Sequence, residues 1–113
     1  MPQYQAPLTD FAFLLNDWLQ IDAHYQRINA AGMDSELALE VLNQGAKFAE
    51  YEIAPLNQSG DEQGCRLVDG NVATPNGFAA AYHTYIANGW NAMLGDPNYD
   101  GQDLPYSMAI PVH

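Results

Sequence analysis

The alternation of apolar and polar positions predicts that most of the chain is helical. From Thr9 to about Ile28, apolar residues recur at the i, i+3, i+4, i+7 and i+8 spacing of an amphipathic helix. Thr9 is the predicted N-cap, and Asp10 suits the positive end of the helix dipole. The stripe consists of Phe11, Leu14, Leu15, Trp18 and Leu19. A helix of this kind must bury its apolar face on its own domain or on a partner.

A second helix is predicted from a cap at Asp34 or Ser35 to about Ala54, with Pro55 ending it. Its expected buried stripe is Leu37, Val41, Phe48 and Ile53, with Leu42, Gly45 and Ala49 beside it. Residues 56–73 are predicted to be a connector. Within it, Asp69-Gly70 allows at most a short two-stranded ribbon, because an isolated hairpin is marginally stable.

A third helix is predicted to start at Thr74-Pro75, an N-cap followed by proline at the first helical position, and to end at Gly89. Its stripe is Phe78, Ala81, Tyr82, Tyr85 and Ile86. A loop follows over residues 95–105, and a last helix starts near Pro105 with Pro111 disturbing it. We therefore expect one all-α domain over residues 1–113 that is incomplete at its C-terminus.

The composition of the chain disfavours several classes of binding partner. The chain has 113 residues and a formal charge of −11, and Arg27, Lys47 and Arg66 are its only Lys and Arg side chains. Such a charge disfavours nucleic acids and anionic membrane surfaces, which require clustered cations. The single Cys65 cannot form an internal disulfide, and neither a signal peptide nor a membrane span is apparent in the sequence. These features predict a soluble cytoplasmic domain without membrane insertion.

The loop 96–103 has the pattern of the first half of an EF-hand, which makes calcium binding an alternative. Asp96, Asn98 and Asp100 stand at loop positions 1, 3 and 5, and Gly101 stands at position 6. Against this, the bidentate Glu of position 12 is replaced by Ser107. A polar turn rich in Asp, Asn and Gly is the favoured interpretation.

The other chemistry-bearing residues form no catalytic constellation. His24, His83 and His113 lack metal-ligand spacing, and Cys65 has no activating neighbour in sequence. No Gly-rich phosphate loop is present. The helically spaced aromatic residues are expected to pack in the core; they are Phe11, Trp18, Phe48, Phe78, Tyr82 and Tyr85.

The ordered set of short motifs resembles the N-terminal region of bacterial acyl-CoA dehydrogenases, in particular the long subfamily of 3-methylmercaptopropionyl-CoA dehydrogenase-like enzymes. The residues that carry the resemblance are Tyr4 to Asp10, Phe13, Leu15, Lys47 to Glu50, Ala54 to Asn57, Gly60-Asp61, Gly64-Cys65, Asp69-Gly70, Thr74-Pro75, Gly77-Phe78, Tyr82, Tyr85, Gly89-Trp90, Asp96-Pro97, Tyr99, Gly101-Gln102 and Leu104-Pro105. They run from about residue 4 to residue 107.

The resemblance implies an all-α domain that packs against a middle β-domain and a C-terminal helical domain of a flavoprotein of fatty acid metabolism. Full enzymes of this family bind FAD and oxidise an acyl-CoA at its α and β carbons. The catalytic base and most flavin contacts come from later domains, so no catalytic or cofactor-binding residue is expected here, and this chain alone is expected to be inactive. A homo-oligomer is expected. The implied substrate-side loop contains Tyr99, Asp100, Gly101, Gln102 and Leu104.

Two positions depart from the family pattern, because Asp100 and Asp103 stand where the family usually has Gly. Aspartate tolerates left-handed backbone geometry less well than glycine, and two carboxylates would repel the CoA phosphates. Two alternatives therefore remain open beside the acyl-CoA dehydrogenase fragment. One is a stand-alone helical protein-interaction module, and the other is a weak calcium-binding helical module.

Overall fold

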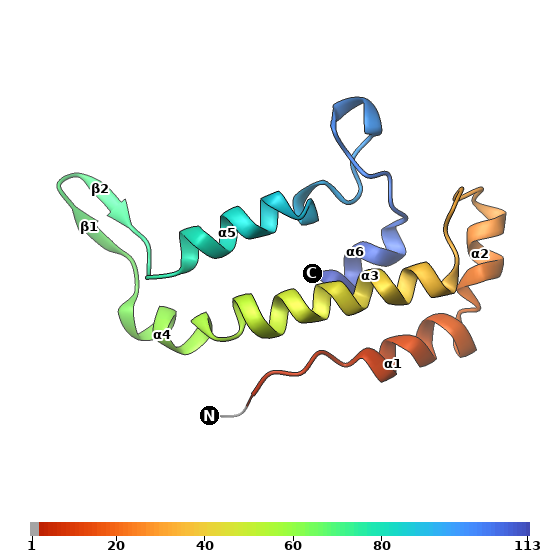
Figure 1. The fold of residues 1–113 in the computed structure, drawn as a ribbon, viewed down its shortest axis with the longest axis horizontal. Coiled ribbons are helices and arrows are strands. Elements are labelled where there is room, and N and C mark those ends of the chain that lie inside the picture. Colours follow the sequence, from red (N-terminus) through yellow and green to blue (C-terminus); the bar gives the residue numbers. More distant parts are fainter. Residues whose placement is uncertain (1–2) are drawn as a thin grey trace.

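The computed structural model describes residues 3–113 and confirms the all-α fold class: among these residues, six α-helices accompany a single two-stranded sheet. Figure 1 shows their arrangement. The α-helices are α1 (Leu8–Ala12), α2 (Ile21–Arg27), α3 (Ser35–Phe48), α4 (Leu56–Gln63), α5 (Phe78–Ala87) and α6 (Tyr106–Val112). The π-helical turns are η1 (Phe13–Trp18) and η2 (Ala49–Ile53), and the 3₁₀ turns are η3 (Trp90–Ala92) and η4 (Pro97–Tyr99). The strands are β1 (Arg66–Val68) and β2 (Asn71–Ala73).

The predicted first helix is interrupted. Instead of one helix over 9–28, α1 widens into the π-helical η1, and Gln20 then adopts a left-handed conformation (φ 49°) before α2 begins. The amide of Leu19 bonds to the carbonyl of Leu14 at 2.8 Å, five residues back. This wider turn rotates the predicted stripe, so that Trp18 is 70% exposed and Leu19 is 56% exposed. The predicted cap was also wrong, since Pro7 occupies the N-cap position rather than Thr9.

A nearly continuous helical rod, formed by α3, η2 and α4, runs through the middle of the molecule (Figure 1). Its start at Asp34 is confirmed, because the Asp34 carboxylate accepts a hydrogen bond from the amide of Leu37 at 2.7 Å. The predicted connector after Pro55 was wrong in its first half. Pro55 is the N-cap residue of α4, where the amide hydrogen that proline lacks is not needed.

The core lies where α2, α3 and α6 meet around the segment after α5. Its buried members are Leu15, Ile21, Tyr25, Ala38, Leu42, Met93 and Met108. On α3 the buried face is Ala38, Leu42 and Ala46, so the predicted stripe was displaced by one position. Leu37 is instead 41% exposed, as is Ile53 of η2 at 45%.

The ribbon at Asp69-Gly70 is confirmed as an antiparallel hairpin of β1 and β2, with Leu67 opposite Val72. Helix α5 starts at Phe78, later than predicted, because Gly77 occupies its N-cap with a left-handed φ of 87°. Its predicted end is confirmed, since Gly89 follows the helix with φ 81°. The last helix is also confirmed, with Pro105 as its N-cap residue.

The molecule is a thin slab of 54 × 38 × 15 Å, with a radius of gyration of 17.1 Å. A compact domain of this length has a radius of gyration of about 13 Å. A slab this thin leaves many large apolar side chains exposed, among them Trp18, Tyr82 and Ile110. Within residues 3–113, no helix is both long enough and apolar enough to cross a membrane.

Candidate functional site

The loop predicted to lie on the substrate side is closed at its neck by backbone hydrogen bonds. The amide of Gln102 donates to the carbonyl of Ala92 at 2.9 Å, and that of Leu104 donates to the carbonyl of Met93 at 2.8 Å. A third amide, from Asp103, donates to the carbonyl of Gly95 at 2.9 Å. Because these hydrogen bonds hold the two ends of the segment together, the segment is a compact loop with a closed base.

Two glycines allow this closure. A Cβ atom on Gly101 would overlap the backbone of Gly95, so the two segments approach as closely as they do because Gly101 has no side chain. The Gln102 side chain adds a further restraint, because its Nε2 donates to the carbonyl of Gly89 at 2.9 Å. The neck is therefore fixed against the end of α5.

Beside the neck lies a hollow of about 540 Å³, which we call the polar hollow. Its apolar wall consists of Val41, Phe48, Trp90, Met93 and Leu104. Its polar and charged lining consists of Glu40, Gln44, Lys47, Tyr51, Glu52, Thr84, Asn88 and Gln102. Small-molecule pockets usually have a predominantly apolar lining, and this hollow has more polar and charged lining residues than apolar ones.

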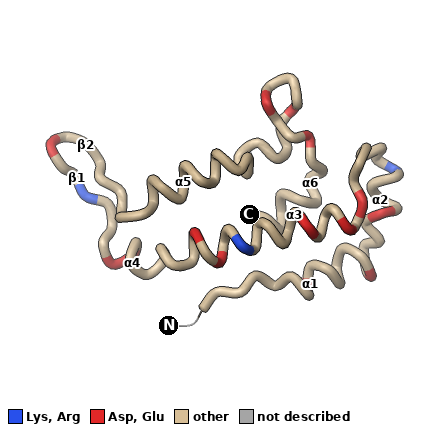
Figure 2. Tube along the Cα trace, in the orientation of Figure 1, with Lys and Arg blue, Asp and Glu red and all other residues tan. Residues whose placement is uncertain are grey.

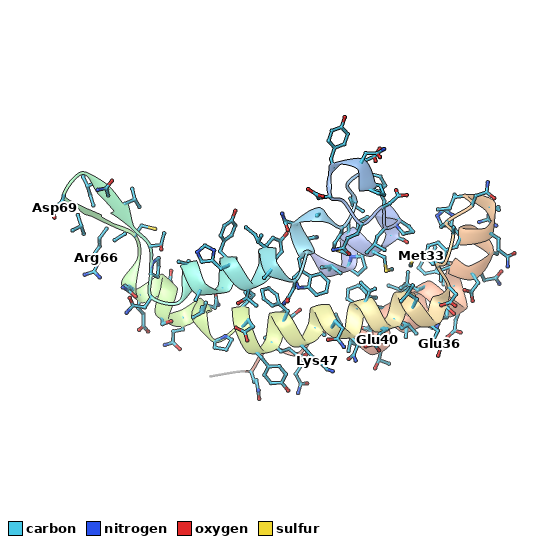
Figure 3. The ribbon with its side chains drawn as sticks, turned by 45° about the horizontal axis from the view of Figure 1, so that its top comes forward. Met33, Glu36, Glu40, Lys47, Arg66 and Asp69 are labelled. Carbon is cyan, nitrogen blue, oxygen red and sulfur yellow. The ribbon has the colours of Figure 1, made fainter. Side chains whose placement is uncertain are left out.

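The charges of the polar hollow disfavour an anion. Lys47 is its only cation, and Glu40 and Glu52 also line it. Glu40 and Lys47 both project from α3, seven positions apart (Figure 3). Glu40 also accepts a hydrogen bond from the Gln44 side chain at 2.8 Å. The hollow thus suits an uncharged group with an apolar part better than a phosphate.

A second hollow of about 660 Å³, which we call the apolar groove, lies between the central rod and α5. Its lining includes Ile53, Leu56, Phe78, Tyr85 and Val112. Phe48 and Trp90 line both hollows, and their ring centroids are 6.4 Å apart. The indole Nε1 of Trp90 is buried without a hydrogen-bond partner among the described residues.

The predicted substrate-side residues separate into three places. Gln102 and Leu104 line the polar hollow. Asp100 and Gly101 lie at the end of η4 and in the neck, and the Tyr99 side chain is 85% exposed on the loop. The loop therefore presents two of its five predicted residues to a hollow.

Sequence reasoning missed most of the hollow's lining. In the sequence, Trp90 stood out only as part of the motif Gly89-Trp90. No sequence pattern indicated that Gln44 and Asn88 would line a hollow. Gly89 was the available clue, because a glycine that ends a helix turns the following residue, Trp90, back towards α3.

The two aspartates at positions where the family resemblance implies glycine both have a left-handed backbone conformation. Asp100 has φ 65° and Asp103 has φ 51°. Glycine adopts these values without steric cost, whereas an L-residue with a Cβ atom is disfavoured there. The loop keeps the backbone shape that glycine permits while carrying two carboxylates.

The structure does not bring together a cluster of side chains that would support the calcium-binding alternative. Within residues 3–113, no group of three or more His, Cys, Asp or Glu side chains is placed to hold a metal ion. The Asp96 carboxylate accepts a hydrogen bond from the amide of Asn98 at 2.8 Å and caps η4. A site made of Asp96, Asn98 and Asp100 stays a prediction.

Cys65 and the histidines lie apart from the polar hollow. Cys65 is a free, exposed thiol beside the hairpin. His113 lies at the apolar groove, where its Nε2 is 2.9 Å from the Tyr85 hydroxyl. Among the core aromatics predicted from sequence, Trp18, Tyr82 and Phe78 are exposed at 70%, 60% and 40%, so the core assignment was wrong for these three.

Comparison with known proteins identifies two curated relatives. The chain is 33% identical over 105 residues to 3-methylmercaptopropionyl-CoA dehydrogenase of Ruegeria pomeroyi, which covers 90% of this chain. It is 28% identical over 112 residues to butyryl-CoA dehydrogenase of Syntrophomonas wolfei, which covers 91% of this chain. The curated relatives of this chain are acyl-CoA dehydrogenases. The resemblance found from the sequence motifs is confirmed by these matches. No family model matches the chain.

The chain spans only 17% of the length of each of these acyl-CoA dehydrogenases. The matched region therefore corresponds to a minor part of a complete acyl-CoA dehydrogenase.

Proposed function

We propose that this chain is the N-terminal helical part of an FAD-dependent acyl-CoA dehydrogenase. The observation that carries the proposal is the 33% identity, over 90% of this chain, to the enzyme named 3-methylmercaptopropionyl-CoA dehydrogenase. The all-helical fold supports it. In this proposal the parent protein oxidises an acyl-CoA, and the 113 residues support its pocket without supplying catalytic groups.

The residues described here do not fit FAD on their own. A dinucleotide diphosphate is usually held by amides of a Gly-rich helix start or by Arg and Lys side chains. The polar hollow offers Lys47 alone, between two glutamates, and the start of α3 is capped by the carboxylate of Asp34. The flavin would therefore be held by other parts of the parent protein.

The polar hollow is the proposed contribution of this chain to the acyl pocket. Its wall of Phe48, Trp90 and Leu104 is apolar, as a thioester's hydrocarbon chain requires. The bonds at the loop neck hold Gln102 and Leu104 in place beside that wall. The CoA phosphates would be bound elsewhere, because Asp100 and Asp103 add negative charge to the loop.

The proposed packing against the middle and C-terminal domains accounts for the thin shape. A slab only 15 Å thick cannot bury both faces of its helices by itself. The apolar groove, lined by Ile53 and Leu56 of the rod and by Phe78 of α5, is the surface proposed to receive side chains of the remaining domains. This role also explains the exposed apolar residues without a separate binding partner.

The test is acyl-CoA-dependent reduction of an artificial electron acceptor by the natively expressed protein, isolated with an antibody raised against this chain. Acyl-CoAs of several chain lengths are compared with free CoA, which has no α and β carbons to oxidise. The proposal predicts reduction with at least one acyl-CoA and none with free CoA. Equal rates with and without the acyl group, or no reduction with any chain length, would contradict it.

A further inference from the structure

Several side chains of the polar hollow have already used their hydrogen-bond donors. The Nε2 of Gln102 donates to the carbonyl of Gly89 at 2.9 Å, and no described residue donates to its Oε1. The hydroxyl of Thr84 donates to the carbonyl of Ala80 at 3.1 Å, so it offers an occupant its lone pairs alone. Gln102 and Thr84 both line the hollow, whereas Gly89 and Ala80 do not. The wall formed by α5 and the loop neck therefore presents acceptors.

The facing wall on α3 has the same property. The Nε2 of Gln44 donates to a carboxylate oxygen of Glu40 at 2.8 Å. An ionised carboxylate can only accept, so this bond fixes which end of the Gln44 amide is nitrogen. The Oε1 of Gln44 is left to accept a hydrogen bond from an occupant. The carboxylate of Glu52 adds further acceptor oxygens to the same lining.

The donors that remain in the polar hollow do not balance these acceptors. Lys47 is the one basic residue on the central rod within residues 35–63, and acidic positions precede and follow it along the rod (Figure 2). The hydroxyl of Tyr51 and the amide of Asn88 each accept as well as donate. The indole N–H of Trp90 is buried, so an occupant of the open hollow does not reach it. The hollow as a whole is rich in acceptors.

We propose that the acyl group received by the polar hollow carries an uncharged hydrogen-bond donor, such as a hydroxyl group, towards its distal end. The inference rests on the proposed function and names the substrate class of that site. The hydrocarbon part lies along Phe48 and Leu104, and the hydroxyl donates to the Oε1 of Gln44 or of Gln102. The hydroxyl takes no part in the oxidation at the α and β carbons and acts only in selection.

Other distal groups fit the polar hollow less well. A carboxylate offers no donor and is repelled by Glu40 and Glu52, whereas an ammonium group is repelled by Lys47. These three charged side chains are all exposed, so solvent and salt weaken selection by charge. A methyl group leaves the acceptor oxygens to water, which still reaches them in an open hollow. The preference for a hydroxyl over a methyl group should therefore be about three- to tenfold, the net effect of one hydrogen bond.

The test compares matched substrates of the natively expressed protein in the acceptor-reduction assay. For each chain length from hexanoyl-CoA to decanoyl-CoA, kcat/KM is measured for the plain acyl-CoA and for its ω-hydroxy derivative. The expected result is a preference for the hydroxylated substrate of this size at one or more chain lengths. The ω-amino and ω-carboxy derivatives of the same length should both be poorer substrates than the hydroxylated one.

Gln44→Met tests the acceptor itself, because methionine keeps the length of the side chain without the amide. It should lower the ratio of the two kcat/KM values by about threefold. Gln58→Met is the matched control. Gln58 is an exposed residue of the same rod, its Nε2 also donates to a glutamate (Glu62, 2.8 Å), and it lines neither hollow. The control should keep the wild-type ratio. A ratio of two rates does not depend on the fraction of the protein that is folded.

The outcomes separate this inference from the proposed function. Oxidation of plain acyl-CoAs as fast as their ω-hydroxy derivatives at every chain length would overturn this inference and leave the proposed function standing. A preference for the ω-amino derivative, or a ratio that Gln44→Met leaves unchanged, would also overturn it. No reduction with any acyl-CoA would contradict the proposed function and this inference with it.

Discussion

The hydroxyl oxygens of Tyr25 and Ser107 lie 2.8 Å apart, although the two residues are 82 positions apart in the sequence. Their hydrogen bond connects α2, near the start of the chain, to α6, near its end. Tyr25 is 2% exposed, and its neighbour in the core, Met108 of α6, is fully buried. The last helix is therefore part of the core, although only seven residues form it.

The first prediction concerns this hydrogen bond. Tyr25→Phe should lower the free energy of unfolding by about 1 kcal/mol at neutral pH, the usual net worth of one hydrogen bond. Ser107→Ala should lower it by at least as much, because it leaves the buried tyrosine hydroxyl without its partner. Urea unfolding of the two variants and the wild type measures the difference. Equal stability of all three proteins would contradict a structural role for the bond.

The same tyrosine predicts a dependence on alkaline pH. Burial raises the pKa of Tyr25 above its ordinary 10.0, the negative charge of Asp22 raises it further, and the hydrogen bond to Ser107 lowers it. The folded protein therefore keeps this proton at a pH where the unfolded chain loses it. The stability that Tyr25 contributes is complete below pH 10 and declines as the pH rises above it. The stability difference between wild type and Tyr25→Phe should be constant below this range and should shrink above it.

A pair of glycine substitutions tests the loop neck. Gly101→Ala should destabilise the protein by about 2–3 kcal/mol, because its Cβ atom would overlap the backbone of Gly95. The matched control is Gly45→Ala in α3, whose Cβ atom would be 3.6 Å from Val112 and 3.7 Å from Trp90, in ordinary contact. That control should stabilise the protein by about 0.5–1 kcal/mol through helix propensity. Urea unfolding should give opposite signs, and the same sign for both would contradict the described neck.

The left-handed aspartates give a third stability test. Asp100→Gly and Asp103→Gly should each stabilise the protein by up to about 1 kcal/mol, because glycine removes the cost of a positive φ. Asp96→Gly is the control, since Asp96 has φ −65° and its side chain caps η4. It should not stabilise the protein and should instead destabilise it by about 0.3 kcal/mol, the usual cost of replacing a capping side chain by glycine. Destabilisation by both Asp100→Gly and Asp103→Gly would show that their side chains matter more than their backbone geometry.

Thermal unfolding with Ca²⁺ tests the calcium alternative. Because no group of three or more His, Cys, Asp or Glu side chains in residues 3–113 is placed to hold a metal ion, we expect the same Tm with Ca²⁺ as with Mg²⁺. A Tm that rises with the Ca²⁺ concentration, and no longer rises in Asn98→Ala, would instead support a calcium module. Asn98→Ala is the informative variant, because the cap on η4 uses the Asn98 backbone and not its side chain.

Local sequence signals predicted several ends of the elements correctly. Asp34, Gly89 and Pro105 each act through their own backbone or side chain, so their effect does not depend on the rest of the fold. The burial of side chains was less predictable. Trp18 and Tyr82 have helical spacing, yet a π turn rotates the first outwards and α5 presents the second on its unpacked face. The exposure of each side chain depends on contacts between different helices. The spacing of apolar residues along one helix carries no information about those contacts.

The loop was predicted as a segment, but its geometry was not. The family motif indicated residues 99–104, and Gln102 and Leu104 do line the polar hollow. Hydrogen bonds across the neck, between partners up to 13 residues apart, decide which side chains turn inwards. No pattern in the sequence specifies those pairings.

The most direct test of the central claim is the intact mass of the natively expressed protein, measured together with its visible absorbance spectrum. Since the chain spans 17% of its curated relatives, our account predicts a yellow flavoprotein roughly six times its mass, in which this sequence is the N-terminal part. A colourless protein of 12.4 kDa would contradict the claim and would assign the function to the helical slab itself.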